Sequence, residues 1–250
     1  MEKPAQSSNM LYFLGDSHLR AVTIAINAGL FGGIRCQVEY VGGATAVGLR
    51  HPTAKTQALV KYRECLLPFR PDVIPVFQLG EVDCGFVIWL RAQRYGESID
   101  QQFEASIHAY RGFLKEVKNA GYSPLVTSAT LPTIRDGDLD GEVSLLRHEV
   151  RATYRERTEL TLRYNDRLKT ICSEEKLGYI DFDIDLIDPE TKLLREWFRH
   201  PDPKDHHLHP ERAGELWVRR VLTKLDERDQ MALHTNHLSV LSLRGSVSKP

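Results

Sequence analysis

The sequence lacks an excess of charge of either sign, and it lacks long apolar runs. Its 33 lysine and arginine residues balance 34 aspartate and glutamate residues, for a formal net charge of -1. They form no basic block of the kind found in nucleic-acid-binding proteins. No apolar run approaches the roughly 18 residues of a membrane span, and residues 1–9 are polar where a secretory signal would be apolar. We therefore expect a cytoplasmic protein that binds neither nucleic acid nor a membrane.

Cysteine is scarce as well, and the spacing of the cysteines does not match that of a metal site. The sequence has no Cys-x-x-Cys pair, which argues against a zinc site and against a disulfide framework. We expect reduced thiols at all positions. The four cysteines are Cys36, Cys65, Cys84 and Cys172.

Internal repeats and low-complexity linkers are also absent. The chain has 250 residues, of which 42% are hydrophobic, and this is enough to bury one sizeable core. We expect one domain over residues 10–226, preceded by a flexible N-terminus over 1–9. Residues 227–250 are expected to form a C-terminal tail, because no clear period is present from residue 231 onward.

Short apolar runs alternate along the chain with longer helical patterns. The predicted strands lie at 11–14, 37–41, 73–79, 125–129 and 179–182. The predicted helices span 98–120, about 153–176, and a segment that begins at Pro210. At the start of the first of them, Ser98 and Gln101 form a capping-box pattern. This alternation predicts an α/β fold with a parallel sheet and helices on both faces. Pro75 lies inside the third run and predicts an edge strand, a bulge or a different boundary there.

Residues able to do chemistry gather where the predicted strands end, which is the edge at which open α/β sheets bind ligands. Gly15-Asp16-Ser17-His18 follows the first strand, and Gly42-Gly43-Ala44-Thr45 follows the second. Gly80-Glu81-Val82-Asp83-Cys84-Gly85 follows the third, which makes Asp16, Glu81 and Asp83 candidates for the rim of a cleft. The last such segment, Asp205-His206-His207-Leu208-His209, directly precedes the helix at Pro210.

Ser17 is the candidate nucleophile. A serine on a strand-to-helix turn lies beside free N–H groups and the positive end of a helix, which stabilise an anion. The hydroxyl needs an imidazole base and a carboxylate to orient that base. Side chains two apart share a face in the extended segment before Pro210, so we expect Asp205 and His207 to point together and His206 to point away. His209 shares the same face and stays an alternative base.

These four segments, in this order, resemble the motifs of the GDSL/SGNH hydrolase superfamily, from Gly15 to about Leu222. The resemblance implies a three-layer α/β/α flavodoxin-like sandwich and a serine esterase mechanism with no metal or other cofactor. Ser17 matches the family's nucleophile and supplies one oxyanion N–H, and Gly43 matches the glycine that supplies a second. His207-Leu208-x-Pro210-Glu211 resembles the family's His-Leu-x-Pro-Glu ending, which supports His207 as the base.

Two departures from the family's pattern concern the site directly. Val82 occupies the place of an asparagine whose side chain normally completes the oxyanion hole, so the third donor is missing or replaced. We interpret this as a feature of one branch of the superfamily. The usual Asp-x-x-His is also absent, because Lys204 lies three positions before His207. Asp205 is the nearest acid in sequence, and Asp202 or Asp83 are alternatives for orienting the base.

The expected substrate is a small-molecule or carbohydrate ester, with a small acyl group as the part removed. Residues 133–157 are charged and are a candidate lid over the cleft, and three aromatic residues are candidates for stacking against a sugar. The lid candidate contains Arg135, Arg147, His148 and Arg151. The aromatic candidates are Trp89, Tyr95 and Trp197.

Three other functions stay open at this level. An acyltransferase could use the same serine, and a binding protein could have kept the fold without turnover, to which the Val82 substitution gives some weight. Asp16-x-His18 and His207-x-His209 also match parts of the binuclear metallophosphoesterase pattern, although the Gly-Asn-His-Asp stretch of those enzymes is absent.

Overall fold

In the computed structural model, five parallel strands form one sheet in the order β2-β1-β3-β4-β5. The structure describes residues 9–138 and 149–245, with side chains as far as residue 230. Parallel neighbours need long crossovers, and the helical segments between the strands provide them. The α/β prediction is confirmed. The strands are β1 (Met10–Gly15), β2 (Arg35–Tyr40), β3 (Val73–Gln78), β4 (Leu125–Thr127) and β5 (Gly178–Ile180).

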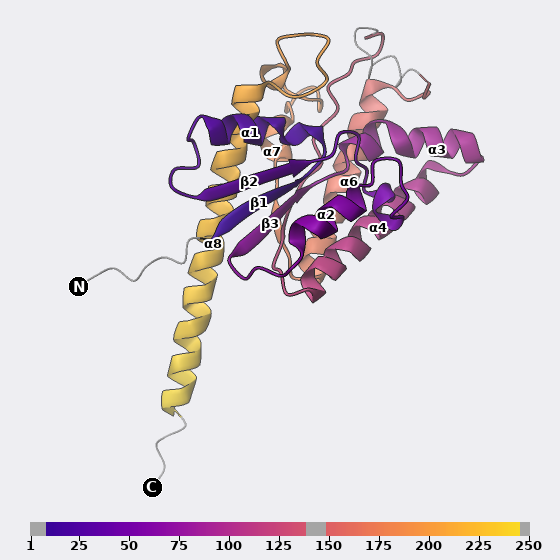
Figure 1. Cartoon of the computed structure of the whole chain (residues 1–250). Helices are drawn as coiled ribbons and strands as arrows, with labels where there is room; N and C mark the ends of the chain where they lie inside the picture. The colour runs from indigo at the N-terminus through magenta and orange to yellow at the C-terminus, as the bar shows by residue number, and fades with distance from the viewer. Residues whose placement is uncertain (1–8, 139–148, 246–250) are drawn as a thin grey trace.

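Helices cover both faces of the sheet, which confirms the three-layer sandwich (Figure 1). The long helices are α1 (Arg20–Asn27), α2 (Ala58–Leu66), α3 (Ile88–Tyr95), α4 (Ile99–Asn119), α6 (Tyr154–Glu174) and α8 (Pro210–Gly245). The shorter helical segments are η1 (Ser17–Leu19), η2 (Val47–Arg50), η3 (Asp83–Val87), α7 (Asp183–Leu186) and η4 (Glu196–Phe198). α1 and α8 lie on one face, and α2, α4 and α6 lie on the other.

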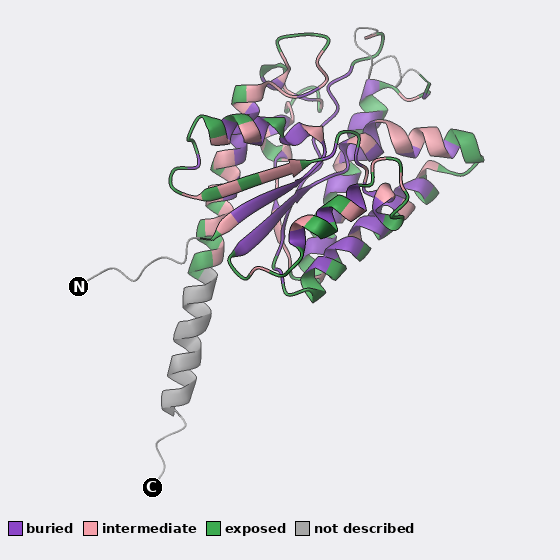
Figure 2. Cartoon of the chain, in the orientation of Figure 1, coloured by how far each residue is buried: buried purple, intermediate pink, exposed green. Residues whose placement is uncertain are grey.

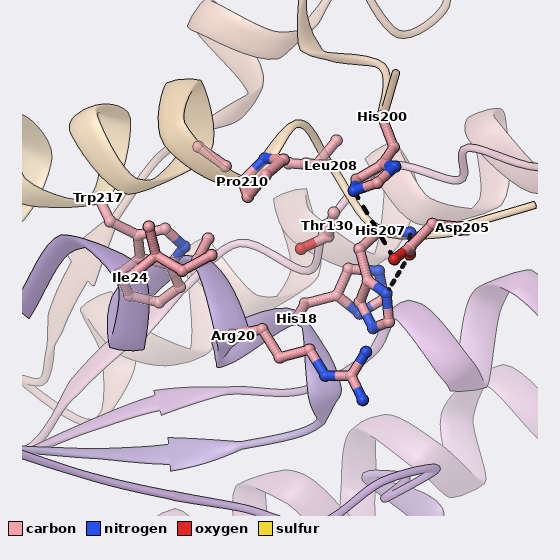
Figure 3. Close-up of a pocket in the computed structure, with 12 residues that line it drawn as sticks. His18, Arg20, Ile24, Thr130, His200, Asp205, His207, Leu208, Pro210 and Trp217 are labelled. Carbon is pink, nitrogen blue, oxygen red and sulfur yellow. Dashed lines mark hydrogen bonds and ion pairs between the residues drawn. The ribbon is translucent and has the colours of Figure 1, made fainter. Parts of the chain in front are cut away.

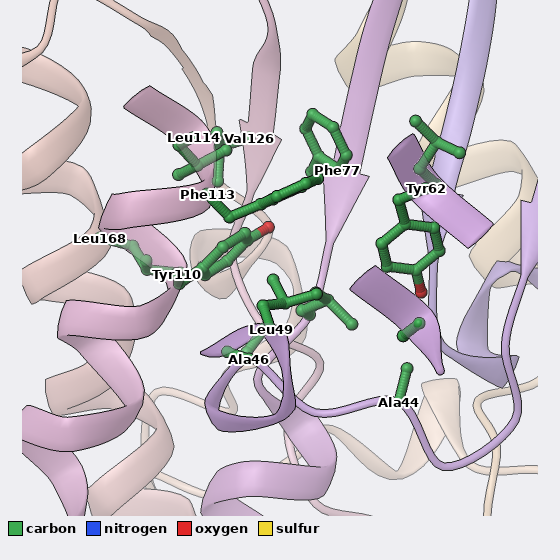
Figure 4. Packing of buried hydrophobic residues seen from close by; sticks show 14 of the residues in the cluster. Ala44, Ala46, Leu49, Tyr62, Phe77, Tyr110, Phe113, Leu114, Val126 and Leu168 are labelled. Carbon is green, nitrogen blue, oxygen red and sulfur yellow. The ribbon is translucent and has the colours of Figure 1, made fainter. Parts of the chain in front are cut away.

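Each face of the sheet has its own apolar core, and the alternation of side chains along β1 supplies both. Leu11 and Phe13 belong to the core under α1 and α8, whereas Tyr12 and Leu14 belong to the core under α2, α4 and α6. The strands between the two helical layers are therefore largely buried (Figure 2). In the second core the rings of Phe77 and Phe113 meet edge to face at 5.3 Å (Figure 4).

The helix starts agree closely with their sequence signals. Ser98 Oγ accepts a hydrogen bond from the N–H of Gln101 at 3.1 Å, and Gln101 Oε1 accepts one from the N–H of Ser98 at 2.8 Å. These two bonds are the capping box that the pattern predicts. Thr153 and Glu156 form a second capping box at the start of α6. Strand boundaries differ more, because β4 and β5 are each three residues long and shorter than predicted.

Pro75 does not mark an edge strand, and β3 lies in the interior of the sheet between β1 and β4. The predicted edge was therefore wrong for the strand as a whole. Pro75 lies opposite Tyr12 of β1, whereas pairing with β4 begins only at Val76. Pro75, which has no N–H, therefore lies in the part of β3 that precedes the start of β4. At this position β3 has only one neighbouring strand, β1.

The last helix is longer than the sequence predicts. α8 begins at Pro210 as predicted and continues to Gly245, so its backbone extends beyond residue 226 into the predicted tail. Within the described residues no helix combines the length and the apolar character needed to cross a membrane.

Cys84 and Cys172 are buried, and all four cysteines are free thiols. Residues 139–148 of the candidate lid, with Arg147 and His148, lie outside the described residues.

Candidate active site

Ser17 lies on the turn that joins β1 to η1. A side chain at Gly15 would not fit, because its Cβ would lie 2.2 Å from the carbonyl oxygen of Gln78 on β3. Asp16 is fully buried, and its Oδ1 accepts hydrogen bonds from the backbone N–H of His18 at 2.9 Å and from the ring Nδ1 of His18 at 3.0 Å. Asp16 therefore fixes the start of the helix instead of facing the cleft, and Ser17 is left partly exposed.

The structure brings Ser17, His207 and Asp205 together, although 190 positions separate the serine from the histidine. His207 Nε2 lies 2.9 Å from Ser17 Oγ. On the opposite side of the ring, His207 Nδ1 lies 2.5 Å from Asp205 Oδ1. The same Asp205 oxygen accepts the backbone N–H of His207 at 2.9 Å. This is the geometry of a nucleophile, a base and an orienting carboxylate.

The loop that carries His207 is held at several points along its backbone. The N–H of His209 donates to the carbonyl of Phe198 at 2.8 Å, and the N–H of Asp205 donates to the carbonyl of Asp202 at 3.1 Å. The Thr133 hydroxyl donates to the carbonyl of His206. Asp202 Oδ1 accepts the N–H of Lys204, so Asp202 stabilises this loop and is not the carboxylate bonded to the base.

The other two histidines of this loop occupy different places. His209 Nδ1 is buried and has no hydrogen-bond partner among the described residues. His206 does not point away from His207 as the extended-strand argument predicts, because their ring centroids are 4.1 Å apart. The reason is the turn that Asp205 makes with the N–H of His207, which bends the segment and removes the simple two-residue alternation.

The environment of His207 favours its neutral form. Burial, and then the neighbouring His18 imidazole, lower the pKa of His207 below its ordinary value, and the hydrogen bond and charge of Asp205 oppose this shift. Burial by itself would raise the pKa of Asp205, but hydrogen bonds from the backbone and ring of His207 outweigh it, so the pKa of Asp205 is lowered. An ionised carboxylate beside a neutral imidazole is the pair that a general base requires.

This lowered pKa leads to a prediction about pH. A base works only when it is neutral, and the neutral fraction of His207 falls as the pH drops through its pKa. We therefore expect kcat/KM for a neutral ester to be flat near about pH 7 and to fall along an acid limb whose midpoint lies below 6.5, the ordinary histidine pKa. Initial rates across the pH range, with spontaneous hydrolysis subtracted, measure that midpoint. A midpoint above 6.5 would show that another group controls the rate.

Asp83 and Glu81 do not form the rim of the cleft, and this corrects the sequence-based expectation. Asp83 is completely buried, and it accepts hydrogen bonds from the N–H groups of Ala46 at 2.7 Å and Val47 at 3.0 Å and from the Ser106 hydroxyl at 2.7 Å. Burial raises its pKa, against the effect of these bonds. Glu81 is also buried. Asp83 therefore anchors the chain that follows β2 and does not orient His207.

Gly43 lies in the turn after β2, with a φ of +69° that favours glycine. The N–H of Val41 donates to the carbonyl of Gly15 at 2.8 Å, and the N–H of Ala44 donates to the carbonyl of Val41 at 3.0 Å. These bonds connect the turn to the end of β1, directly before Ser17. The second oxyanion N–H at Gly43 stays a prediction.

Among the described residues, one group of side chains could hold a metal ion. Asp205, His206 and His207 each offer a ligand atom, and these atoms lie within 4.8 Å of one another. Two of the three are already bonded to each other, and Asp16 and His18 form a separate pair. A binuclear centre needs more ligands converging on two ions than this group offers.

A cavity of about 190 Å³ lies beside the triad (Figure 3). Its walls include His18 and Ile24 on the α1 side, Ala213 and Trp217 on the α8 side, and His207. None of the three aromatic residues proposed for sugar stacking lines it. Trp89 donates its Nε1–H to the carbonyl of Cys84, Tyr95 lies under Arg91, and Trp197 lies under Arg212.

No protein-family model matches the sequence, and no curated protein matches it either. Solved structures do match. A GDSL-like lipase from Bacteroides thetaiotaomicron superposes with a TM-score of 0.59 at 12% identity, over 91% of this chain and 93% of that one. The chain has the fold of the GDSL/SGNH hydrolases.

Two further structures that match this chain are described as esterases. An acetyl xylan esterase matches with a TM-score of 0.53 at 13% identity, over 86% of this chain and 98% of that one. A psychrotrophic esterase from Pseudoalteromonas, in a structure inhibited by monoethylphosphonate, matches with a TM-score of 0.51 at 11% identity, over 87% and 99%. At these identities the likeness concerns the fold.

Within this SGNH fold, two local features differ from the family's motifs. The acid and the base are two positions apart, as Asp205 and His207, and the turn between them allows the contact that a helical Asp-x-x-His would otherwise provide. Val82 precedes η3 and has no polar atom in its side chain with which to contact an oxyanion.

Sequence reasoning missed the anchoring role of Asp83, because its partners lie 23 to 37 positions away and no local pattern indicates them.

Proposed function

We propose that the protein is a serine esterase that forms an acyl-enzyme on Ser17. The observation that carries the proposal is the chain of contacts from Ser17 Oγ through His207 to Asp205, at 2.9 and 2.5 Å. Each contact lies within hydrogen-bond distance, so the base needs no rearrangement to accept the serine proton. The fold of this chain, which it shares with solved structures of esterases, supports the same reaction class.

In the proposed mechanism Ser17 Oγ attacks the ester carbonyl while His207 Nε2 takes its proton. The imidazolium that results is stabilised by the Asp205 carboxylate. The tetrahedral oxyanion accepts hydrogen bonds from the N–H groups of Ser17 and Gly43. When the intermediate collapses, the C–O bond to the alcohol breaks and His207 returns the proton to the departing oxygen. Water then attacks the acyl-enzyme in the same way, and the acid is released with Ser17 regenerated.

A small acyl ester on a carbohydrate or metabolite is the proposed substrate class. The support is the small volume of the cavity beside His207, about 190 Å³, and the presence of an acetyl xylan esterase among the structures with this fold. The N–H donors of Ser17 and Gly43 hold the oxyanion without help from Val82. Losing one donor typically lowers the rate by about a hundredfold or more, so a modest kcat is consistent with this site.

Covalent labelling tests the proposal directly. A fluorophosphonate probe should modify the folded wild-type protein at Ser17, and peptide mass spectrometry should locate the adduct. The matched control is Ser98→Ala, which removes an exposed hydroxyl at the start of α4 and should leave labelling unchanged, whereas Ser17→Ala should abolish it. An unlabelled, folded wild-type protein would favour a binding role. Labelling combined with transfer to an added alcohol in preference to water would indicate an acyltransferase.

A further inference from the structure

Arg20 lies on the same face of the helix as the nucleophile. η1 continues into α1 with helical backbone at Leu19 and Arg20, so Ser17 and Arg20 are one helical turn apart. Residues three apart are neighbours on such a turn, because a 3₁₀ segment has three residues per turn. The side chain of Arg20 therefore leaves the helix beside that of Ser17.

The positive charge of Arg20 is not neutralised within the described part of the chain. Its side chain is exposed, and none of the described carboxylates forms an ion pair with it. The two acids of the site are already bonded, Asp16 to His18 and Asp205 to His207. By contrast, Arg199 on the neighbouring segment is paired with Glu196.

Arg20 also lines the cavity beside the triad. Three imidazoles, of His18, His200 and His207, share this cavity with it, and Ile24 and Trp217 supply apolar wall. The Asp205 carboxylate also lines the cavity, but it is bonded to His207 and not to Arg20. Figure 3 shows the guanidinium end of Arg20 on the side of His207, whereas Ile24 and Trp217 lie at the opposite end. A ligand with an apolar part and a negatively charged group fits both ends of such a cavity.

The positive charge of Arg20 opposes the protonation of His207 during the attack of Ser17. The charge of Arg20 is one of the influences that lower the pKa of His207, after burial and His18. His207 must become an imidazolium when Ser17 attacks, and a nearby positive charge destabilises that state. A bound anion would neutralise Arg20 and remove this opposition. The arrangement is therefore best suited to a substrate that brings a negative charge of its own.

We propose that the site acts on esters that carry an anionic group such as a carboxylate, and that Arg20 binds this group. The proposal rests on the esterase function proposed above and specifies the substrate class of the same site. The negative charge can belong to the acid part or to the alcohol part of the ester, because both parts lie close to Ser17 during the reaction. Arg20 contacts the substrate and takes no part in the proton transfers.

The test uses matched pairs of esters that differ in charge. 4-Nitrophenyl hemisuccinate and 4-nitrophenyl butyrate share a leaving group and differ by a carboxylate in the acid part, and 2-acetoxybenzoate and phenyl acetate differ by a carboxylate in the alcohol part. For at least one pair, Arg20→Gln should lower kcat/KM for the anionic ester by about 10- to 100-fold, the usual effect of losing a charge-assisted hydrogen bond. The neutral ester of that pair should change by less than about threefold.

Two further measurements complete the experiment. Salt should lower kcat/KM for the anionic ester in the wild type and not in Arg20→Gln, because screening weakens the charge interaction. Arg94→Gln, which removes an exposed arginine on α3, is the matched control and should leave all four esters unaffected. If Arg20→Gln affects the anionic and neutral members of both pairs equally, or affects none of them, the proposal is overturned.

Binding without turnover separates this proposal from the esterase proposal. In the Ser17→Ala protein, calorimetric titration with monomethyl succinate should give tighter binding than with methyl butyrate, and Arg20→Gln should remove the difference. If the wild type hydrolyses none of the esters but this difference is observed, the esterase proposal fails while the anion site stands. If hydrolysis is observed without any charge preference in rate or binding, the anion site fails alone.

Discussion

Replacing His207 by alanine is expected to lower kcat for ester hydrolysis by between about 10⁴- and 10⁶-fold, the range found when a triad base is removed. His207 is the histidine whose Nε2 reaches Ser17, so its loss leaves the hydroxyl without a proton acceptor. Steady-state kinetics with a neutral nitrophenyl ester measures the effect, and far-UV circular dichroism checks the fold. Added imidazole should restore part of the rate, because it can occupy the space left by the ring.

His209→Ala is the matched control for this experiment. It removes the same kind of side chain two positions further along the same loop, where the ring does not contact Ser17. We expect kcat to stay within about tenfold of the wild type, since the catalytic contacts are untouched. The assignment of His207 fails if His209→Ala is the more damaging of the two changes, or if both variants keep most of the activity.

Replacing Asp83 by alanine is expected to lower both stability and activity. The change removes the acceptor for three buried donors, the N–H groups of Ala46 and Val47 and the hydroxyl of Ser106. Unpaired buried donors are costly, and together they should lower the free energy of unfolding by about 3–5 kcal/mol. The turn that contains Gly43 precedes Ala46 directly, so kcat should fall as well, by about a hundredfold if the second oxyanion donor is displaced.

Urea denaturation and kinetics at a temperature well below the transition measure the two effects separately. Asp100→Ala is the control, because Asp100 lies exposed on α4 and pairs with Arg163 at the surface, where such pairs contribute about 0–1 kcal/mol. Asp83→Asn keeps one acceptor oxygen and should fall between the wild type and alanine. A change in unfolding free energy below about 1 kcal/mol for Asp83→Ala would contradict the anchoring role.

The parts of this structure that the sequence predicts are those encoded by short-range patterns. The capping box at Ser98 uses residues three apart, and the helix starts near Thr153 and at Pro210 depend on equally local signals. The alternation of strands and helices is sufficient for the parallel sheet, because parallel pairing needs a crossover at each step. Asp205 and His207 do point together as predicted, although a turn brings them together instead of the two-residue alternation of an extended segment.

Features that depend on contacts between distant segments could not be predicted. The apolar-polar period cannot show that the pairing of β3 with β4 begins only at Val76, one residue after Pro75, which decides how a proline is tolerated in an interior strand. No pattern near Asp83 indicates that its partners lie after β2 and on α4. The position of His206 was predicted wrongly because a single hydrogen bond, from the backbone N–H of His207 to the Asp205 carboxylate, changes the course of the loop.

The site contains the same small arrangement twice. In Asp16-x-His18 and again in Asp205-x-His207, one carboxylate oxygen accepts both the backbone N–H and the ring Nδ1 of the histidine two residues later. In the second case the acid and the base form a unit that depends on only three consecutive residues. The bonds that hold the loop, from the His209 N–H to the Phe198 carbonyl and from the Thr133 hydroxyl to the His206 carbonyl, set the distance from this unit to Ser17. The orientation of the base and its distance from the nucleophile are thus fixed by different parts of the chain.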